Sequence, residues 1–465
     1  MTTSASIPTD RDAFERWCAD NAMTVVVVGT SDTNGSWIGK RMPVAEFLRA
    51  YDHHGVAFCD VFWVLTRDGL ATIEPTPGLT TYFPTKQNGY PDIFFRADLA
   101  TARVLSWHEG TITVNGSHHL PDGRPVTISP RTQLSAQIER ARGHGLEVKF
   151  ASEFEFYVLN GTPEALREND YDFRPLSSRP YTYQVFRSSM DHELLSSWIT
   201  HLTNAGIVVE ALNPETGPGQ YELNTKYTDA LRAADDAFIY KNGIKELAAL
   251  DGKTAMFMAL PRADWSGSSC HLHQSLWSTD TGASVMAEDG DDLRLSKIGR
   301  HYVAGVLATL CEFAPLYWPT VNSYRRSRPY SWAATTRTWG HDNRSTALRL
   351  VGEDRSSLRL ENRMGGADVN PYVAIAASLA GGIHGIEREL ELPAAYGGDA
   401  YADPSLEPLP TNLGQALTLF EHSEVAREFF GDDFVNHYTI MKRAELAQFE
   451  SHVSDWEVRT YTETA

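Results

Sequence analysis

Short segments of the sequence place acidic, imidazole and guanidinium side chains two residues apart. Three segments carry them: Glu153 and Glu155 in ASEFEFYVL, His271 and His273 in CHLHQSL, and Glu361 between two arginines in LRLENR. Because successive side chains of a strand point to opposite faces, each segment would present its polar groups on one face. Any one segment alone is more typical of the solvated face of a strand. Together they suit a divalent cation, because neighbouring carboxylates repel each other unless a cation lies between them.

Oxygen ligands predominate in this predicted metal site. Two further glutamates, Glu215 and Glu222, flank a Gly-Pro-Gly turn in NPETGPGQYEL. Carboxylate-rich ligation favours magnesium or manganese over zinc. The chain has no CxxC pair to bind zinc, and its four cysteines are far apart in the sequence: Cys18, Cys59, Cys270 and Cys311. We therefore expect Mg²⁺ or Mn²⁺ as the cofactor, and free thiols in a reducing compartment.

Arginines are concentrated between Asn322 and Arg363, although the formal net charge of the whole chain is −19. This range contains nine arginines, four acids and no lysine, and tryptophans lie between the arginines. A guanidinium group binds phosphate or carboxylate oxygens two at a time. Arginines and metal ions facing one cleft predict chemistry on polyphosphates. The sequence has neither GxxxxGK[ST] nor GxGxxG, so it does not support a P-loop or a dinucleotide fingerprint.

The composition is that of a globular protein, with 42% hydrophobic and 22% charged residues among 465. This length accommodates two or three domains. The negative charge disfavours nucleic acid and anionic membranes as partners, because both would repel the chain. No run of about 18 apolar residues predicts a membrane-spanning helix, and the N-terminal residues lack the pattern of a secretory signal. We therefore expect a cytoplasmic protein.

The elements that must position these residues fall into two predicted domains, 10–126 and 127–465. The first combines short apolar runs with turn signals such as Asn34-Gly35, which predicts a small strand-rich domain. In the second, we expect helices at 129–145, 189–205, 228–250, 295–314, 371–391, 413–428 and 436–448. We expect strands at 148–158, 219–226, 269–276, 344–350 and 356–363. Helices and strands do not alternate regularly, which favours an α+β fold.

Taken in order, the motifs of the second domain resemble those of the glutamine synthetases and their amine-using relatives, the γ-glutamylamide and γ-glutamylpolyamine synthetases. They lie between residues 128 and 390: SEFEFY, NPETGPGQYEL, KYTDALRAAD, GSSCHLHQSL, PTVNSYRR, WGHDNRSTALRL and LRLENRMGGADVNPYVAIAA. The resemblance implies a β-grasp-like N-terminal domain and a catalytic domain of antiparallel sheet with helices. It also implies a homo-oligomer, often a dodecameric ring, with active sites between adjacent subunits.

The resemblance also assigns roles to individual residues. The ligands of one metal ion would be Glu155, Glu215 and Glu222, and those of a second would be Glu153, His271 and Glu361. The residues that bind ATP would be His273, Ser275, Arg344, Arg349, Arg359 and Tyr227. The residues that hold glutamate would be Arg326, Gly267 and Arg363. The residues that take part in catalysis would be Arg344, Arg349 and Arg363; to these we add Trp332, which lies where the sequence departs from the family pattern.

The implied activity is that of an ATP-dependent ligase with glutamate, ATP and a small amine as partners. ATP phosphorylates the γ-carboxylate of glutamate, and the amine then displaces phosphate from the γ-glutamyl phosphate to form an amide. Metal ions and arginines neutralise the charge of the transferring phosphoryl group. Water must be excluded, because it would hydrolyse the acyl phosphate.

The acceptor site departs from the pattern of the ammonium-using members. Those members have a glutamate shortly after the NSYRR-like motif, and Trp332 occupies that position here. Their flap Asn-Gly is replaced by Ser266-Gly267, and Asp60 is only a poor match to their first-domain aspartate. An indole face suits an organic amine better than ammonium. Two alternatives stay open: an ammonium-using glutamine synthetase, and an inactive scaffold or sensor of this family.

Overall fold

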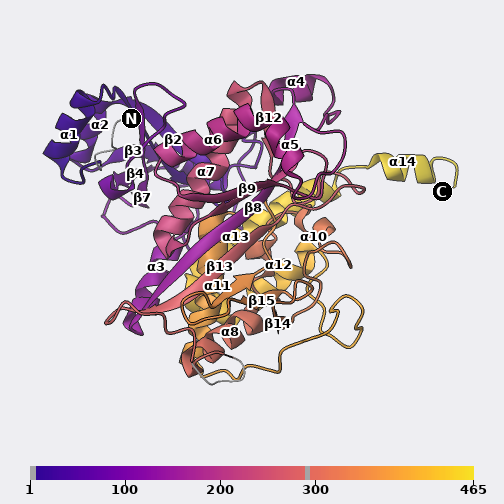
Figure 1. The fold of residues 1–465 in the computed structure, drawn as a ribbon. Helices are drawn as coiled ribbons and strands as arrows, with labels where there is room; N and C mark the ends of the chain where they lie inside the picture. The colour runs from indigo at the N-terminus through magenta and orange to yellow at the C-terminus, as the bar shows by residue number, and fades with distance from the viewer. Residues whose placement is uncertain (1–6, 289–293, 465) are drawn as a thin grey trace.

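The N-terminal part of the chain forms two small sheets with two helices beside them (Figure 1). The computed structural model describes residues 7–288 and 294–464. The first sheet has the order β2-β1-β6-β5, with β1 and β6 parallel, and the second has the order β3-β4-β7. The elements of this part are α1 (Arg11–Asp20), β1 (Val25–Ser31), β2 (Trp37–Pro43), α2 (Val44–Tyr51), β3 (Val56–Cys59), β4 (Asp92–Ala97), β5 (Arg103–Val104), β6 (Thr111–Val114) and β7 (Gly116–His119).

A nine-stranded sheet runs through the rest of the molecule. Its order is β14-β15-β16-β13-β8-β10-β9, and β11 and β12 also pair with β8. Every pairing in it is antiparallel except that of β14 with β15. The strands are β8 (Leu146–Asn160), β9 (Val209–Pro214), β10 (Gln220–Thr225), β11 (Thr228–Asp229), β12 (Lys253–Met256), β13 (Cys270–Ser278), β14 (Trp339–His341), β15 (Leu348–Val351) and β16 (Arg359–Asn362).

Helices cover one face of this sheet. The long strand β8 alternates, with Phe150, Phe154 and Phe156 fully buried on that face. Helices α3 and α7 pack against β8, and α11 packs against α3, α7 and α8. The helices are α3 (Pro130–Gly143), α4 (Pro163–Glu168), α5 (Val185–Met190), α6 (His192–Asn204), α7 (Ala230–Leu250), α8 (Lys297–Thr309), α9 (Ala314–Tyr317), α10 (Ser323–Arg326), α11 (Pro371–Glu387), α12 (Leu413–His422), α13 (Glu424–Glu450) and α14 (Asp455–Tyr461). The predicted α+β fold is confirmed.

Helix α11 is the centre of the helical layer because its apolar residues extend around the whole helix. It approaches α8 closely at Gly305, where a β-carbon would lie 2.1 Å from the carbonyl oxygen of Gly381. Glycine is therefore required at this crossing, since any side chain would push the two helices apart.

Several predicted boundaries differ from the structure. The helix expected at 413–428 is two helices, because Ser423 ends α12 and caps α13. The helix expected at 436–448 is the second half of α13, which bends at Gly431, where φ is 76°. The strand expected at 344–350 begins only at Leu348, since Asn343 binds the backbone of Ser345 in a turn. The division between residues 126 and 127 stays a prediction.

No helix in the described part of the chain is both long and apolar enough to cross a membrane.

A buried ionic network ties the N-terminal part to the helices. Arg131 on α3 binds Asp235 on α7 through two hydrogen bonds of 3.1 Å. Asp235 also accepts hydrogen bonds from Asn115 at 2.8 Å and Tyr372 at 2.6 Å. Both charged side chains are almost completely buried. Removing one partner would leave an uncompensated charge in the interior.

We therefore predict that Asp235→Ala lowers the free energy of unfolding by about 3 kcal/mol, because Arg131 would remain buried with only the half-exposed Asp98, 3.5 Å away, as a partner. The guanidinium chloride midpoint of tryptophan fluorescence measures this loss. Asp122→Ala is the matched control, since Asp122 pairs with Arg124 on the surface and its removal should shift the midpoint very little. Equal midpoints for the two variants would contradict the prediction.

Candidate active site

Strand register brings the predicted residues onto the sheet face that the helices leave uncovered. Glu222 on β10 lies opposite Glu155 on β8, and His271 on β13 lies opposite Glu153. Glu361 on β16 lies between its partners His273 on β13 and Arg349 on β15. Side chains opposite one another in neighbouring strands point to the same face, so one polar surface crosses five strands.

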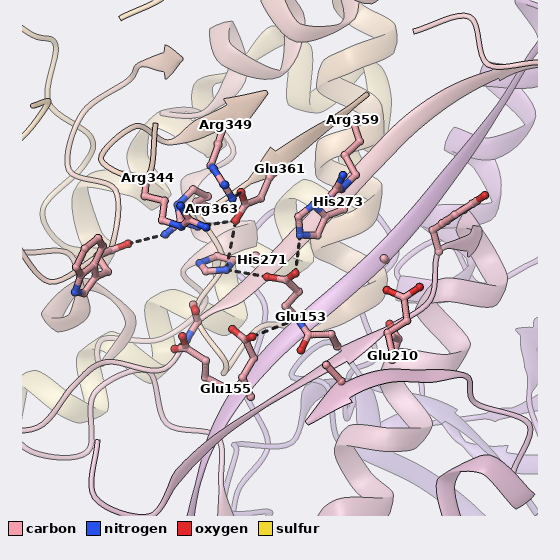
Figure 2. Close-up of a pocket in the computed structure, with 18 of the residues that line it drawn as sticks. Glu153, Glu155, Glu210, His271, His273, Arg344, Arg349, Arg359, Glu361 and Arg363 are labelled. Carbon is pink, nitrogen blue, oxygen red and sulfur yellow. Dashed lines mark hydrogen bonds and ion pairs between the residues drawn. The ribbon is translucent and has the colours of Figure 1, made fainter. Parts of the chain in front are cut away.

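This surface forms the floor of a cavity of about 1240 Å³, which all sixteen predicted site residues line. Figure 2 shows the arginines and Glu361 on one side of the cavity and Glu153, Glu155 and Glu210 on the other. The sixteen are Glu153, Glu155, Glu215, Glu222, Tyr227, Gly267, His271, His273, Ser275, Arg326, Trp332, Arg344, Arg349, Arg359, Glu361 and Arg363. They come from segments more than 200 residues apart, which the fold collects around one space.

Glu361 is the most enclosed of the carboxylates, with 1% of its side chain exposed. It accepts hydrogen bonds from Arg349 at 2.7 Å and from Arg363 at 2.5 Å. Burial alone would raise its pKa, but the nearby cationic groups, Arg363 foremost, lower the pKa of Glu361 to about 2. Its charge is therefore already balanced by the protein.

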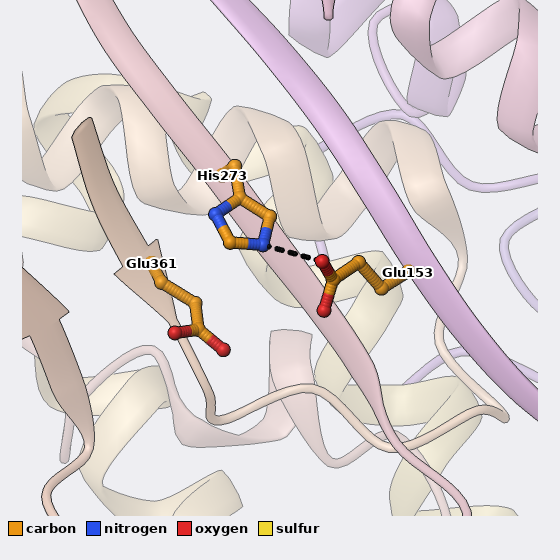
Figure 3. Close-up of side chains that lie close together, drawn as sticks. All are labelled: Glu153, His273 and Glu361. Carbon is orange, nitrogen blue, oxygen red and sulfur yellow. Dashed lines mark ion pairs between the residues drawn. The ribbon is translucent and has the colours of Figure 1, made fainter. Parts of the chain in front are cut away.

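Glu153 lies between two imidazoles. Its carboxylate is 2.9 Å from Nε2 of His273 and 3.4 Å from Nδ1 of His271. Figure 3 shows the ring of His273 pointing toward Glu153, with the carboxylate of Glu361 nearby. Burial opposes ionisation of Glu153, but the two histidines outweigh it and hold its pKa below the usual range. Burial also lowers the pKa of His271, so this imidazole is neutral at pH 7, the form that binds a metal.

Among the described residues, Glu215 and Glu222 have no positively charged side chain within ion-pair distance. The side-chain groups that donate to them are neutral: the amide of Asn213 and the hydroxyl of Thr216 to Glu215, and the amide of Asn224 to Glu222. Burial and the neighbouring carboxylates raise the pKa of Glu215 to about 7 and that of Glu222 to about 8. Buried carboxylates without a cationic partner are unfavourable, so this end of the cavity has the chemistry of a divalent metal site.

Two sets of three potential ligand atoms lie within 4.8 Å of one another. One set is Glu153, His273 and Glu361, and the other is Glu153, Glu222 and His271. Both include Glu153, whereas the predicted grouping places Glu222 with Glu155 and Glu215. The predicted second set contains His271 and not His273. The donor set of carboxylates and imidazoles fits one or two divalent cations, and the division of ligands between them stays a prediction.

The arginines occupy different depths of the site. Arg326 is buried and donates to the carbonyl oxygens of Met364 at 2.6 Å and Gly365 at 2.8 Å. A β-carbon at Gly267 would lie 2.5 Å from Cγ of Arg326, so glycine is required for the chain to pass over this side chain. Arg359 lies beside the histidines, with its Nε 3.2 Å from Nδ1 of His273. Arg344 is in a turn and not on the strand that the sequence predicts.

Two cavity residues that the sequence analysis missed follow the same spacing of two. Trp277 continues the series His271, His273 and Ser275 on β13, and its ring is parallel to that of Tyr227 within 16°. Lys149 lies four residues before Glu153 on β8, and its ammonium nitrogen is 4.2 Å from the centre of the Trp277 ring. Alternation along the two strands was the signal for both. Tyr183 and Glu210 also line the cavity, and no motif pointed to them.

The loop that carries Trp332 forms one wall of the cavity. The indole is 60% exposed, and the residue has φ of 63°. Its carbonyl oxygen accepts a hydrogen bond of 3.2 Å from Arg363, and the next carbonyl, of Ala333, accepts one from Tyr401 at 3.1 Å. Asp60 is not among the cavity residues; it is buried against the hydroxyl of Tyr82. The hydrogen bonds from Arg363 and Tyr401 fix the backbone of the loop directly after the indole.

The chain is similar to known proteins in sequence and in fold. A family model described as glutamine synthetase, catalytic domain, matches residues 127–461. Over 456 residues the chain is 38% identical to a glutamate–isopropylamine ligase of Pseudomonas sp., covering 97% of this chain and 96% of that protein. It is 40% identical over 435 residues to the γ-glutamylethanolamide synthetase GlnA4 of Streptomyces coelicolor, covering 93% and 91% of the two chains.

A solved structure of a GmaS/ADP complex has a TM-score of 0.83 and 25% identity, covering 98% of this chain and 100% of that chain. The family model spans well over half of the sequence, and the relatives match it almost from end to end. These matches show that the chain belongs to the glutamine synthetase family.

Proposed function

We propose that the chain is an ATP-dependent ligase that joins the γ-carboxylate of glutamate to an organic amine through γ-glutamyl phosphate. The observation that carries this proposal is the single cavity in which unpaired carboxylates, arginines and Trp332 meet. Two relatives at 38% and 40% identity are named for isopropylamine and for ethanolamine, both small monoamines. A small monoamine is accordingly the acceptor class that we propose here.

In this proposal the acidic residues bind metal ions and the arginines bind the anionic groups of the substrates. Glu155, Glu215 and Glu222 would hold one Mg²⁺ or Mn²⁺ ion, and Glu153, His271 and Glu361 a second. When bound, these ions neutralise negative charge on the phosphates of ATP. The remaining residues act on the organic substrates. Arg326 and Arg363 would bind the carboxylates of glutamate, and Arg344, Arg349 and Arg359 would bind the phosphates, with His273, Ser275 and Tyr227 completing the ATP site.

The acceptor would approach along the Trp332 loop. Residues 327–335 contain no acid, so this wall has an aromatic surface where an ammonium site needs a carboxylate. A carbon-bearing amine gains contact with the indole, and its cationic form gains a further attraction to the ring face. An ammonium-using glutamine synthetase is the main alternative, and substrate comparison distinguishes the two.

An inactive scaffold or sensor is the alternative from another class. Burying Glu215 and Glu222 beside other carboxylates raises their pKa values and costs stability in the metal-free chain. A chain without catalysis would have no physical reason to keep that arrangement. Release of phosphate with glutamate and any amine would exclude this alternative.

We also propose that residues 10–126 form a β-grasp-like domain, separate from the catalytic domain 127–465, and that the protein is a homo-oligomer, a dodecameric ring by resemblance. Sedimentation velocity measures the mass of the assembly and so tests the proposed homo-oligomer. We expect one species many times the mass of a single chain, because active sites shared between subunits require a closed assembly. A fully active monomer would contradict this prediction.

Metal affinity should depend on pH, because protons compete with the metal for Glu215 and Glu222. Their pKa values of about 7 and about 8 mean that both carboxyls gain protons as the pH falls from 8.5 to 6.5. If both bind the same Mn²⁺ ion, its affinity should fall about 100-fold over this range. At pH 7, binding should release about one to two protons.

Calorimetric titration of Mn²⁺ at pH 7 in two buffers with different heats of ionisation measures this release. Glu222→Gln is the control variant, since an amide has no proton to lose; the release should decrease to that of Glu215 alone. An Mn²⁺ affinity that is constant between pH 6.5 and 8.5 would show that these carboxyls do not bind the metal.

The acceptor assignment predicts how substrate preference changes at position 332. The wild type should have a kcat/KM for isopropylamine or ethanolamine at least about 10-fold above that for ammonium. Trp332→Glu should lower kcat/KM for the preferred amine by about 10- to 100-fold and raise that for ammonium, because it exchanges an aromatic surface for a carboxylate. Phosphate release with each amine provides the measurement.

Trp332→Phe is the matched variant, since it keeps an aromatic face and should keep the preference for the organic amine. If ammonium is the best substrate of the wild type, the protein is an ordinary glutamine synthetase. If Trp332→Glu and Trp332→Phe behave alike, the indole does not line the acceptor pocket.

A further inference from the structure

A second cavity, of about 490 Å³, lies apart from the active site. It lies between the turn at residues 34–36, helices α7 and α13, and the segment that leads into α10. Four cationic side chains and two carboxylates line it: Arg67, Lys241, Lys245, Arg325, Asp368 and Glu445. In a chain whose formal net charge is −19, this local excess of positive charge stands out as a feature that the proposed ligase does not use.

Two of the cations face the cavity without a carboxylate partner in the described part of the chain. Lys245 is exposed, and its ammonium lies 5.6 Å from the centre of the Phe257 ring. Arg325 is also exposed, and its guanidinium lies 5.8 Å from the centre of the Phe449 ring. An aromatic ring attracts a cation weakly and does not neutralise it. Both groups can therefore bind an anion without first breaking an ion pair.

The third cation, Lys241, is also not neutralised by a carboxylate. It is buried at the back of the cavity and donates to the carbonyl oxygens of Ala367 at 2.6 Å and Val369 at 2.8 Å. Burial, followed by the charge of Lys245, lowers the pKa of Lys241 to about 7. A negative charge in the cavity would relieve this repulsion between the two lysines.

The two carboxylates of the cavity are already engaged. Asp368 accepts hydrogen bonds of 2.6 Å from the hydroxyls of Thr320 and Ser323. Glu445 accepts one of 3.1 Å from Lys442 and a longer one of 3.4 Å from Arg67. Lys442 is itself buried and adds a further positive charge beside the cavity. Asp32 is a third carboxylate near Lys245 and Lys442, and burial raises its pKa. Among the described residues, five basic side chains thus outnumber three carboxyl groups around this space.

We infer that this cavity binds a small organic carboxylate, held by Lys245 and Arg325 with its carbon chain against Phe257, Met258 and Phe449. Phe257 lies beside Lys245 and Phe449 beside Arg325, so an inorganic anion would leave these apolar side chains without contacts. Lysine and arginine bind carboxylate oxygens through charge-assisted hydrogen bonds, which are stronger than neutral ones. The cavity has room for a molecule of a few carbon atoms together with water.

The occupant of this cavity would touch elements that support the active site. Phe257 packs on Phe156 and Phe154, with ring centres 5.1 and 6.2 Å apart, and both belong to the strand that carries Glu153. Lys241 holds the backbone of Ala367, three residues after the carbonyl of Met364 that binds Arg326. An anion here is therefore placed to act on the glutamate and metal sites through β8 and residues 364–369.

Calorimetric titration with succinate tests the inference on the full-length protein, saturated with Mg²⁺-ADP and glutamate so that the arginines of the active site are occupied. We expect succinate to bind and its neutral analogue succinamide not to bind. Lys245→Met and Arg325→Met should each weaken succinate binding by about 10-fold or more, the loss expected for one charge-assisted hydrogen bond. Both side chains are exposed, so the variants should fold, and an unchanged Tm verifies this.

Lys297→Met is the matched control, because Lys297 is exposed and pairs with Glu389 away from both cavities. It should leave succinate binding unchanged. Absence of heat up to about 50 mM succinate, or equal affinity in the wild type, Lys245→Met and Arg325→Met, would overturn the inference; this concentration is well above the millimolar affinity of a weak specific site. The measurement needs no turnover, so its result is independent of the amine that the ligase uses.

Discussion

Repulsion between like charges is the constraint on which this structure depends. Strand pairing places Glu222 directly opposite Glu155, and Glu215 follows at the end of the neighbouring strand. These carboxylates are held on a sheet whose other face is packed by Phe154 and Phe156, so they have little freedom to separate. Such an arrangement is stable only with protons or cations between the oxygens. The sheet itself thus holds these carboxylates where they must share either protons or a cation.

The two ends of the cavity differ in the groups that lie beside their carboxylates. Glu361 has two arginines and Glu153 has two histidines, whereas Glu215 and Glu222 have neither. One end therefore has guanidinium and imidazole groups beside its carboxylates, while the carboxylates at the other end have no positively charged partner among the described residues. In the function proposed above, a nucleoside triphosphate with its cations would suit both ends, because arginines bind phosphates and carboxylates bind divalent metal ions.

Much of the site could be predicted because it lies on strands, where a spacing of two identifies a common face. The same rule would have found Trp277 and Lys149, which continue the series on β13 and β8. What the sequence does not contain is the pairing: only the fold places His273 opposite Glu361 and groups it with Glu153. Loop residues followed no such rule. A turn around Asn343 replaced the strand that we expected at Arg344, because side-chain hydrogen bonds there compete with the ladder.

The Trp332 loop connects the acceptor side of the cavity to the carboxylate side through backbone contacts. Arg363 donates to Glu361 through one guanidinium nitrogen and to the carbonyl oxygen of Trp332 through another. The loop position is therefore set by the main chain and by Arg363, and the indole is free to serve as a binding surface. A residue of another chemistry at 332 retains the same carbonyl. Under the proposed function, exchange of a carboxylate for an indole at this wall would change the class of amine while leaving the residues on the strands in place.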